Sequence, residues 1–423
     1  MLGRVSARAI VWTVPSLYAA GAIAVGILLP RIEDRLWPGA SSSISVASAT
    51  AIYSSIAAGT MALTAIVFSL TFVMMQFSAT AYSPRLVLWL ARDPLIAHAL
   101  GVFCATFLYA IAALAWVDRH GSNMVPPASA VTVLVLLVAT IGMFIGIIER
   151  TALLQINRML TFTGDQGRRV IAALYPRLQP RVAAHDAEAA PRPAPTQVVS
   201  HRGRPSAIQA LDIPELMRLA LAVHGSIDVL AAVGDTVMES APLLRVLGGD
   251  HIVDETLFLR AIARGEERTF EQDPKYAIRL LVDIAIRALS PAVNDPTTAV
   301  QALDQIGDLL LRLARRRLEI GAFRDGDGAV RVTVPFPTWD DFLRLAFDEI
   351  RSYGAGSIQV MRRMKALIAD LSSLVPEERR PALAYWKERL DRTVTTHFTD
   401  PVELEQASVE DRQGLGVSRR SVA

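Results

Sequence analysis

The side chains best suited to chemistry gather in one stretch of the chain, SPAVNDPT, at residues 290–297. A helix that begins at Pro296 would expose free backbone N–H groups beside the Thr297 hydroxyl, which suits an anion. The Asp295 carboxylate would disfavour an anion there, so a small cation or a contact between subunits competes, and the sequence does not rank these two. The candidate recognition or assembly corner comprises Arg287, Ser290, Pro291, Asn294, Asp295, Pro296 and Thr297.

Two helices must position this corner, because apolar residues recur with helical spacing on both sides of it. Pro291 cannot continue the first helix, which is expected to end at Leu289 or Ser290. The Asn-Asp pair at 294–295 can cap the second helix, and Pro296 suits its first position because its φ is already helical. The pattern predicts either a rigid corner between packed helices or a recognition surface.

No arrangement of residues in the sequence favours catalysis. The seven histidines are scattered, Cys104 is the single cysteine, and no H-E-x-x-H, Walker or G-x-S-x-G pattern occurs. Asp304 and Asp308 are one helical turn apart and could bind a divalent cation. No third ligand lies nearby in the sequence, which favours a solvated helix face. We therefore expect no enzyme activity, no metal site and no cofactor.

The composition indicates a membrane protein. The chain has 423 residues, of which 52% are apolar, and its mean hydropathy is +0.34. The net charge of +2 gives no basic field that would attract nucleic acid. Charged residues are sparse in residues 1–150 and occur at soluble-protein density afterwards. One part of the chain is therefore expected in lipid and the other in water.

Four spans are predicted, at about 9–29, 46–77, 95–117 and 128–148, each long enough to cross a hydrocarbon layer of ~30 Å. Arg4, Arg85 and Arg150 mark the flanking segments as cytoplasmic, so both termini are expected on the cytoplasmic side of a bacterial inner membrane. The spans so drawn contain no Asp, Glu, Lys or Arg. This counts against an ion-coupled transporter but not against a passive pore.

The second span carries small and hydroxyl residues at intervals of seven, which place them along one slowly drifting stripe. Such residues allow close packing between helices. Alternatively, they line a hydrated path in an oligomer, where hydroxyls replace part of an ion's hydration shell. The pore-lining candidates are Thr50, Ala57, Thr64, Thr71 and Ser78.

The expected fold is a membrane α-helical domain with four transmembrane helices, followed by a mostly α, α+β cytoplasmic domain with a small β-rich subdomain. Its expected parts are 1–150, the transmembrane domain; 151–206, a connecting helix and flexible linker; 207–249, the β-rich subdomain; 250–400, a helical domain; and 401–423, a polar, disordered tail. In the helix before the corner, Arg279 and Asp283 are spaced to pair along one face.

Three stretches carry a resemblance to a family: FSLTFVMMQFSATAYSPRLV, EERTFEQDPKYAIRLLVDIAIRALSPAVNDPTTAVQALD and VPFPTWDDFLRLAFDEIRSYG. They resemble a widespread family of bacterial predicted membrane proteins of unknown function. The chain departs from the family pattern where Ala79 to Tyr82 are inserted before Ser83, and where Ser240 or Ala241 replaces a glycine. The resemblance implies the fold and the membrane location and supplies no catalytic residues.

The sequence therefore favours a homo-oligomeric, channel-like membrane protein whose cytoplasmic domain gates or assembles it. The alternative is a non-conducting, membrane-anchored sensor or scaffold that binds a ligand or partner through that domain. The expected partners are the lipid bilayer, further copies of the chain, and a small ion or anionic ligand, but not nucleic acid.

Overall fold

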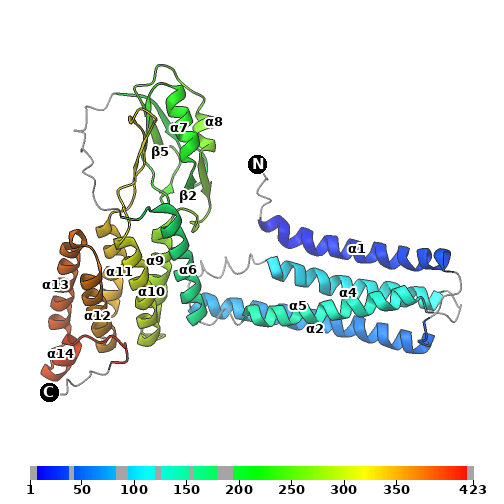
Figure 1. Cartoon of the computed structure of the whole chain (residues 1–423). Helices are drawn as coiled ribbons and strands as arrows, with labels where there is room; N and C mark the ends of the chain where they lie inside the picture. Colours follow the sequence, from blue (N-terminus) through cyan, green and yellow to red (C-terminus); the bar gives the residue numbers. More distant parts are fainter. Residues whose placement is uncertain are drawn as a thin grey trace. The chain divides into compact units, whose positions relative to one another are not determined.

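The computed structural model describes residues 7–37, 42–81, 94–119, 125–151, 156–178 and 194–416. The chain divides into two compact units, Met1–Ile156 and Asn157–Ala423, called the membrane unit and the C-terminal unit below. Figure 1 shows the helices and strands that form each unit.

Four long apolar helices are described in the membrane unit: α1 (Ala7–Leu36), α2 (Val46–Ala81), α4 (Pro94–Arg119) and α5 (Pro127–Thr151). Each contains a stretch long and apolar enough to cross a membrane, at Thr13–Leu36, Val46–Leu70, Leu95–Val117 and Pro127–Glu149. The predicted fold class is confirmed for the part of the chain that the structure describes.

The central helix of the membrane unit is α4, which packs against α1, α2 and α5. Half of its apolar stretch is buried inside the protein, whereas the value is 17–22% for the other three helices. Tyr109 of α4 packs in one core cluster with Tyr53 of α2, and the hydroxyls of Thr106 and Thr140 join α4 to α5 at 2.8 Å. The three outer helices therefore keep wide apolar faces for lipid or for other helices.

The first helix continues further than the sequence indicated. The predicted span ended at Leu29 because Pro30 and a charged run follow, but α1 passes through Pro30 and ends at Leu36. Glu33 explains the extension, because its carboxylate accepts a hydrogen bond from Ala128 N at the first turn of α5, at 2.8 Å. The span as drawn, 9–29, holds no charged residue, but the longer candidate span Thr13–Leu36 includes Glu33.

The C-terminal unit is mostly helical. Its helices are α6 (Ile156–Leu174), α7 (Ile213–Ala222), α8 (Glu255–Arg260), α9 (Pro274–Ala288), α10 (Pro296–Ala314), α11 (Trp339–Tyr353), α12 (Ile358–Leu374), a 3-10 turn (Glu377–Arg379), α13 (Arg380–His397) and α14 (Pro401–Ser408). Helix α10 packs against α9, α11 and α12.

Two small sheets stand beside these helices. Their strands are β1 (Pro195–Ser200), β2 (Ser206–Leu211), β3 (Ser226–Val229), β4 (Thr236–Val237), β5 (Pro242–Leu247), β6 (Ile262–Gly265), β7 (Ala322–Arg324) and β8 (Val330–Thr333). One sheet has the order β1-β5-β3-β8-β7 and the other β4-β2-β6. Only β3 and β8 pair in parallel among these strands, whereas every other pairing is antiparallel.

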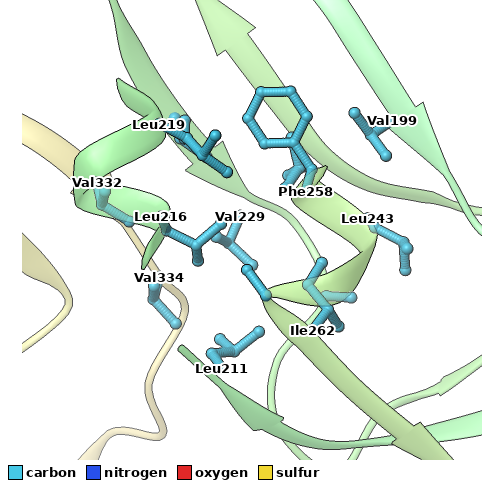
Figure 2. Packing of buried hydrophobic residues seen from close by; sticks show 14 of the residues in the cluster. Val199, Leu211, Leu216, Leu219, Val229, Leu243, Phe258, Ile262, Val332 and Val334 are labelled. Carbon is cyan, nitrogen blue, oxygen red and sulfur yellow. The ribbon is translucent and has the colours of Figure 1, made fainter. Parts of the chain in front are cut away.

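A continuous apolar core fills this β-rich part (Figure 2). Leu216 and Leu219 of α7 and Phe258 of α8 contribute side chains that are at most 2% exposed. They meet Leu243 of β5 and Val332 of β8, which is far along the chain. Burial of such side chains contributes about 1.5–3 kcal/mol each, so residues 322–334 belong to the same folded core as residues 199–262.

Two predictions of flexible segments are wrong. Residues 195–200, expected in a linker, form β1 because they pair with β5. The tail from Asp400, expected to be disordered, forms α14 and an ordered segment up to residue 416. Asp400 caps α14 by accepting from Val402 N at 2.9 Å, and Asp411 accepts from Gly416 N at 2.7 Å.

Candidate functional site

The predicted corner joins α9 to α10 as expected. Helix α9 ends at Ala288 with Leu289 as its C-cap, and α10 begins at Pro296. Asp295 is the N-cap of α10, since its carboxylate accepts from Thr298 N at 3.1 Å and from Thr298 Oγ1 at 2.6 Å. The helix boundaries read from the two prolines are confirmed, and Asp295 is the residue that caps.

Hydrogen bonds within the turn hold its backbone in one conformation. Ser290 Oγ donates to Arg287 O at 2.7 Å, and Asn294 N donates to Ser290 O at 2.8 Å. Asp295 N donates a hydrogen bond to Ala288 O at 2.8 Å. Asn294 has a φ of +48°, in the left-handed region that asparagine tolerates better than most residues. This supports the rigid-corner interpretation.

The corner also presents polar groups to solvent. Pro291, Asn294 and Thr297 are exposed. Gln359 of α12 lies within 3.5 Å of the Thr297 hydroxyl and also donates to Gly414 O, so the C-terminal segment reaches this surface. The Asp295 carboxylate occupies the N-terminus of α10, where an anion would bind. The geometry therefore favours a contact surface or a cation over an anionic ligand.

The positive φ at Asn294 gives a test of how strictly the corner is built. Asn294→Ala is expected to lower the free energy of unfolding by about 1–2 kcal/mol, because alanine resists the left-handed region. Asn294→Gly is expected to stay near wild type, since glycine adopts it freely. Urea unfolding of the full-length protein in detergent, followed by pulse proteolysis, measures both. Equal losses in the two variants would show that the amide side chain matters rather than the backbone.

The N-terminus of α9 is held by a buried ion pair. Asp273, which is 1% exposed, caps the helix by accepting from Tyr276 N at 3.2 Å. Arg268 Nε donates to the same carboxylate at 2.8 Å. Burial raises the pKa of Asp273 above its ordinary value, although Arg268 opposes that shift. A Cβ at Gly234, whose φ is +91°, would lie 2.5 Å from Asp273 Oδ2. The turn after β3, which contains Gly234, therefore packs tightly against the Arg268–Asp273 pair.

A second ion pair links α9 to α11. Arg279 Nε donates to Asp283 at 2.7 Å, so the pairing predicted from the four-residue spacing is confirmed. The other nitrogens of Arg279 bind both carboxylate oxygens of Glu349, at 2.9 and 2.6 Å. Glu349 is 70 residues further along the chain, so no local pattern predicts this contact.

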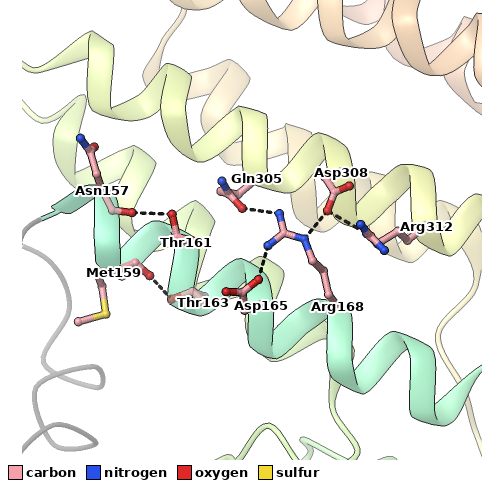
Figure 3. Close-up of polar contacts among 9 residues, drawn as sticks. All are labelled: Asn157, Met159, Thr161, Thr163, Asp165, Arg168, Gln305, Asp308 and Arg312. Carbon is pink, nitrogen blue, oxygen red and sulfur yellow. Dashed lines mark hydrogen bonds and ion pairs between the residues drawn. The ribbon is translucent and has the colours of Figure 1, made fainter. Parts of the chain in front are cut away.

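A third polar cluster, called the α6 clasp here, joins α6 to α10 (Figure 3). Arg168 of α6 donates to Asp308 at 2.6 Å, to Gln305 at 2.7 Å and to Asp165 at 2.8 Å. Arg312 donates to the same Asp308 oxygen at 2.9 Å. Burial acts to raise the pKa of Asp308, but the hydrogen bonds from Arg312 and Arg168 outweigh it and hold that pKa below its ordinary value.

The helices of the clasp approach closely because α6 carries glycines on the contact face. A Cβ at Gly167 would lie 2.8 Å from a methyl carbon of Leu309, and one at Gly164 would lie 2.3 Å from Gln305 Oε1. The aspartates expected on a solvated face each bind an arginine instead, since Asp304 accepts from Arg363 at 2.7 Å. Among the described residues, no group of three or more His, Cys, Asp or Glu side chains could hold a metal ion.

The predicted stripe of the second span lies on α2 as drawn. Thr50 is exposed, Ala57 is buried, and Thr64 is half-buried with its hydroxyl donating to Thr60 O at 2.7 Å. The side chains of Thr71 and Ser78 lie outside the described residues. The middle of the stripe thus faces the protomer's own helices, and its pore-lining role stays a prediction.

These features define a class: a helical membrane protein with several spans that carries a mostly helical C-terminal unit with two small sheets. The chain belongs to the family described as Predicted membrane protein (DUF2254), whose model matches residues 8–370. The three stretches at 68–87, 266–304 and 334–354 all lie within that match.

The chain is also similar to uncharacterized mycobacterial proteins. Mb1321c of Mycobacterium bovis and Rv1290c of Mycobacterium tuberculosis are each 28% identical to it over 366 residues, which cover 84% of this chain and 68% of the relative. No solved structure matches the chain. The comparisons therefore show the family to which the chain belongs and name no activity.

Proposed function

We propose that this protein is a homo-oligomeric, channel-like membrane protein of the bacterial inner membrane, with a cytoplasmic C-terminal unit that assembles or gates it. The observation that carries the proposal is an exposed stripe of small residues along one face of α2. We infer from this stripe that α2 meets a second copy of the chain. No catalytic step is assigned to the protein.

The stripe follows the spacing of a helix–helix interface and is called the small-residue face below. Its members are separated alternately by four and three residues, and all are exposed in the protomer: Ala51, Ser55, Ala58, Ala62, Ala65 and Ser69. The opposite face of α2 is the packed one, where Ala49, Tyr53, Ala57, Thr60 and Val67 are buried. Without a hydrophobic effect between helices in lipid, small residues favour association because they let two backbones approach closely.

A conducting path, if present, runs between protomers. Within one protomer the centre of the membrane unit is filled by α4 and its core of Tyr53, Tyr109 and neighbouring alanines. Symmetric association of α2 helices provides a ring in which a shared path can form. Helix α6 begins at Ile156, shortly after α5 ends at Thr151, so movement of the α6 clasp is suited to act on the spans.

The second candidate is a non-conducting sensor or scaffold with the same cytoplasmic domain. One observation favours it: the Thr60 and Thr64 hydroxyls donate to backbone carbonyls of their own helix, at 2.6 and 2.7 Å. These hydroxyls are therefore already satisfied without an ion. The exposed corner would then be the surface that binds a ligand or partner.

The small-residue face makes assembly testable. Ala62→Leu is expected to shift the protein from oligomer to monomer, by at least tenfold in the dissociation constant, because a bulky side chain keeps two α2 backbones apart. Ala24→Leu is the control, since Ala24 is an exposed alanine of α1 that lies off this face. The oligomeric state of each variant is determined by measuring its mass in detergent. A wild-type protein that is strictly monomeric in detergent would contradict the proposed oligomer.

Conduction separates the two candidates. Purified protein in planar bilayers is expected to carry ions, and Ala62→Leu, which keeps two protomers apart, is expected to abolish this flux. An oligomer that carries no flux at any voltage or with any ion tested would favour the scaffold.

A further inference from the structure

A buried polar cluster lies within the membrane unit, among apolar helices. It consists of Glu33, Tyr53, Tyr109 and Ser129, called the Glu33 centre here, and the four come from α1, α2, α4 and α5 respectively. Their exposed fractions are 4%, 3%, 1% and 2%. Ionisable and polar groups at such sites are costly in a membrane and commonly mark a function.

Two oxygen atoms of the Glu33 centre have no hydrogen-bond partner, Glu33 Oε2 and the Tyr53 hydroxyl, whereas the Tyr109 hydroxyl lies within reach of the hydroxyls of Ser129 and Thr132. The other carboxylate oxygen, Glu33 Oε1, accepts from Ala128 N. The two tyrosines and Glu33 interact electrostatically, and the Tyr109 hydroxyl neighbours Ser129. Buried polar atoms without partners are rare and call for a ligand or water.

The charge of Glu33 is only partly compensated. The N-terminus of α5 contributes roughly half a positive charge. Arg31 is one of two arginines of α1, with Arg35, that lie two residues from Glu33 along the chain. It donates to Ile27 O at 3.3 Å, and its guanidinium lies 5.7 Å from the centre of the Trp116 ring. Among the side chains that the structure describes, no basic group forms an ion pair with Glu33. A buried carboxylate in this state is costly unless a positive charge joins it.

We propose that the Glu33 centre binds one monovalent metal cation of the size of Na⁺, through Glu33 Oε2 and the hydroxyl oxygens of Tyr53, Tyr109 and Ser129. Hard cations prefer oxygen ligands of this kind. A single carboxylate balances a single positive charge, whereas a divalent ion would leave a surplus. A proton on Glu33 is the competing occupant, and the response to acid in the experiment below distinguishes it from a metal cation.

The cation would connect all four described spans, because each contributes one of its ligands. A groove of about 500 Å³ is lined by residues of α1, α4 and α5 that include Tyr18, Tyr109 and Thr132. The cation site is a property of one protomer, so it does not depend on conduction or on assembly through the small-residue face.

Thermal unfolding of the full-length protein in a non-ionic detergent tests this site. Sodium is exchanged for N-methylglucamine, which is too large to enter, at constant ionic strength. The wild-type melting temperature is expected to rise with sodium and then saturate. Glu33→Gln keeps an oxygen for Ala128 N but removes the charge, so its melting temperature is expected to lose the sodium dependence. Tyr109→Phe keeps the ring, and we expect it to weaken the apparent sodium affinity about tenfold, or ~1.4 kcal/mol.

Asp34→Asn is the matched control, since Asp34 is the exposed carboxylate next to Glu33 on α1, and it should respond to sodium as wild type does. Three results would overturn the proposal. The wild type could melt at the same temperature in both salts, which indicates water in the site. Acid alone could stabilise it, which indicates a proton. Glu33→Gln and Tyr109→Phe could both respond fully to sodium, which places the ion elsewhere. If Glu33→Gln does not fold, the sodium dependence of the melting temperature in Tyr53→Phe and Tyr109→Phe tests the proposal instead.

Discussion

Arg268→Ala is expected to lower the free energy of unfolding of the C-terminal unit by about 3–5 kcal/mol. The variant leaves the Asp273 carboxylate, which is 1% exposed, without its positive partner. Removing one member of a buried pair costs this much because the remaining charge stays in a low-dielectric interior. The same change removes the guanidinium 5.7 Å from the centre of the Tyr276 ring. Pulse proteolysis of the full-length protein in urea measures the loss.

The pH dependence of this variant follows from the direction of the Asp273 shift. Burial raises the pKa of Asp273 in the folded protein, and Arg268 acts to lower it, so the variant should have a still higher folded pKa. For an acid whose folded pKa is raised, the folded state binds more protons than the unfolded state. Stability is then complete below the unfolded pKa and is lost as pH rises through the folded pKa. Acidification from neutral pH should therefore restore part of the loss in Arg268→Ala.

Arg218→Ala is the control for the buried pair. Arg218 binds Glu215 on the surface of α7, where its side chain is 60% exposed, and exposed pairs of this kind contribute little to stability because solvent screens them. Its loss should be small at every pH. If Arg268→Ala were no more harmful than Arg218→Ala, the ion pair at the start of α9 would not hold the unit together.

Three structural roles of individual side chains explain the specificity of the stretch at 266–304. Arg268 and Asp273 hold the start of α9, Arg279 joins α9 to α11, and Asp295 caps α10. Each of these roles needs one particular side chain at one place. The specificity of the stretch is thus explained by the architecture around the corner.

The sequence was sufficient where the signal is local. Pro291 and Pro296 bound the corner because proline acts on its own turn, and the spans were visible because some twenty apolar residues in succession have few other uses. The sequence misled at Pro30, where a helix that would end by local rules is continued because Glu33 caps α5 about 95 residues away. A local rule cannot include a partner that distant.

The remaining parts of the structure depend on pairings between distant residues. β1 forms because β5 lies beside it, and β8 joins β3 across about 105 residues. Arg168 contacts Gln305 and Asp308, which are 137 and 140 residues away along the chain. One signal was available beforehand: Gly164 and Gly167, three apart in an otherwise regular helix, indicate a close approach to a neighbouring helix.

Arg168→Ala is expected to release α6 from α10 and to lower the stability of the C-terminal unit by about 1.5–3 kcal/mol, the size of a hydrogen bond to a charged group. Arg312→Ala is a matched control, because Arg312 binds the same oxygen of Asp308 but lies on α10 itself and is 50% exposed. Removing it should cost roughly 0.3–0.5 kcal/mol. Limited proteolysis of the full-length protein should cleave α6 readily in the first variant and not in the second.

The clasp also tests the proposed gating. Helix α6 is the next described helix after α5 along the chain. A channel controlled by the C-terminal unit should therefore change its open probability in Arg168→Ala while its mass in detergent stays that of the oligomer. Arg312→Ala should leave both unchanged. If Arg168→Ala freed α6 to proteolysis yet left flux as in wild type, control of the path would not pass through the α6 clasp, and the C-terminal unit would be left with a role in assembly alone.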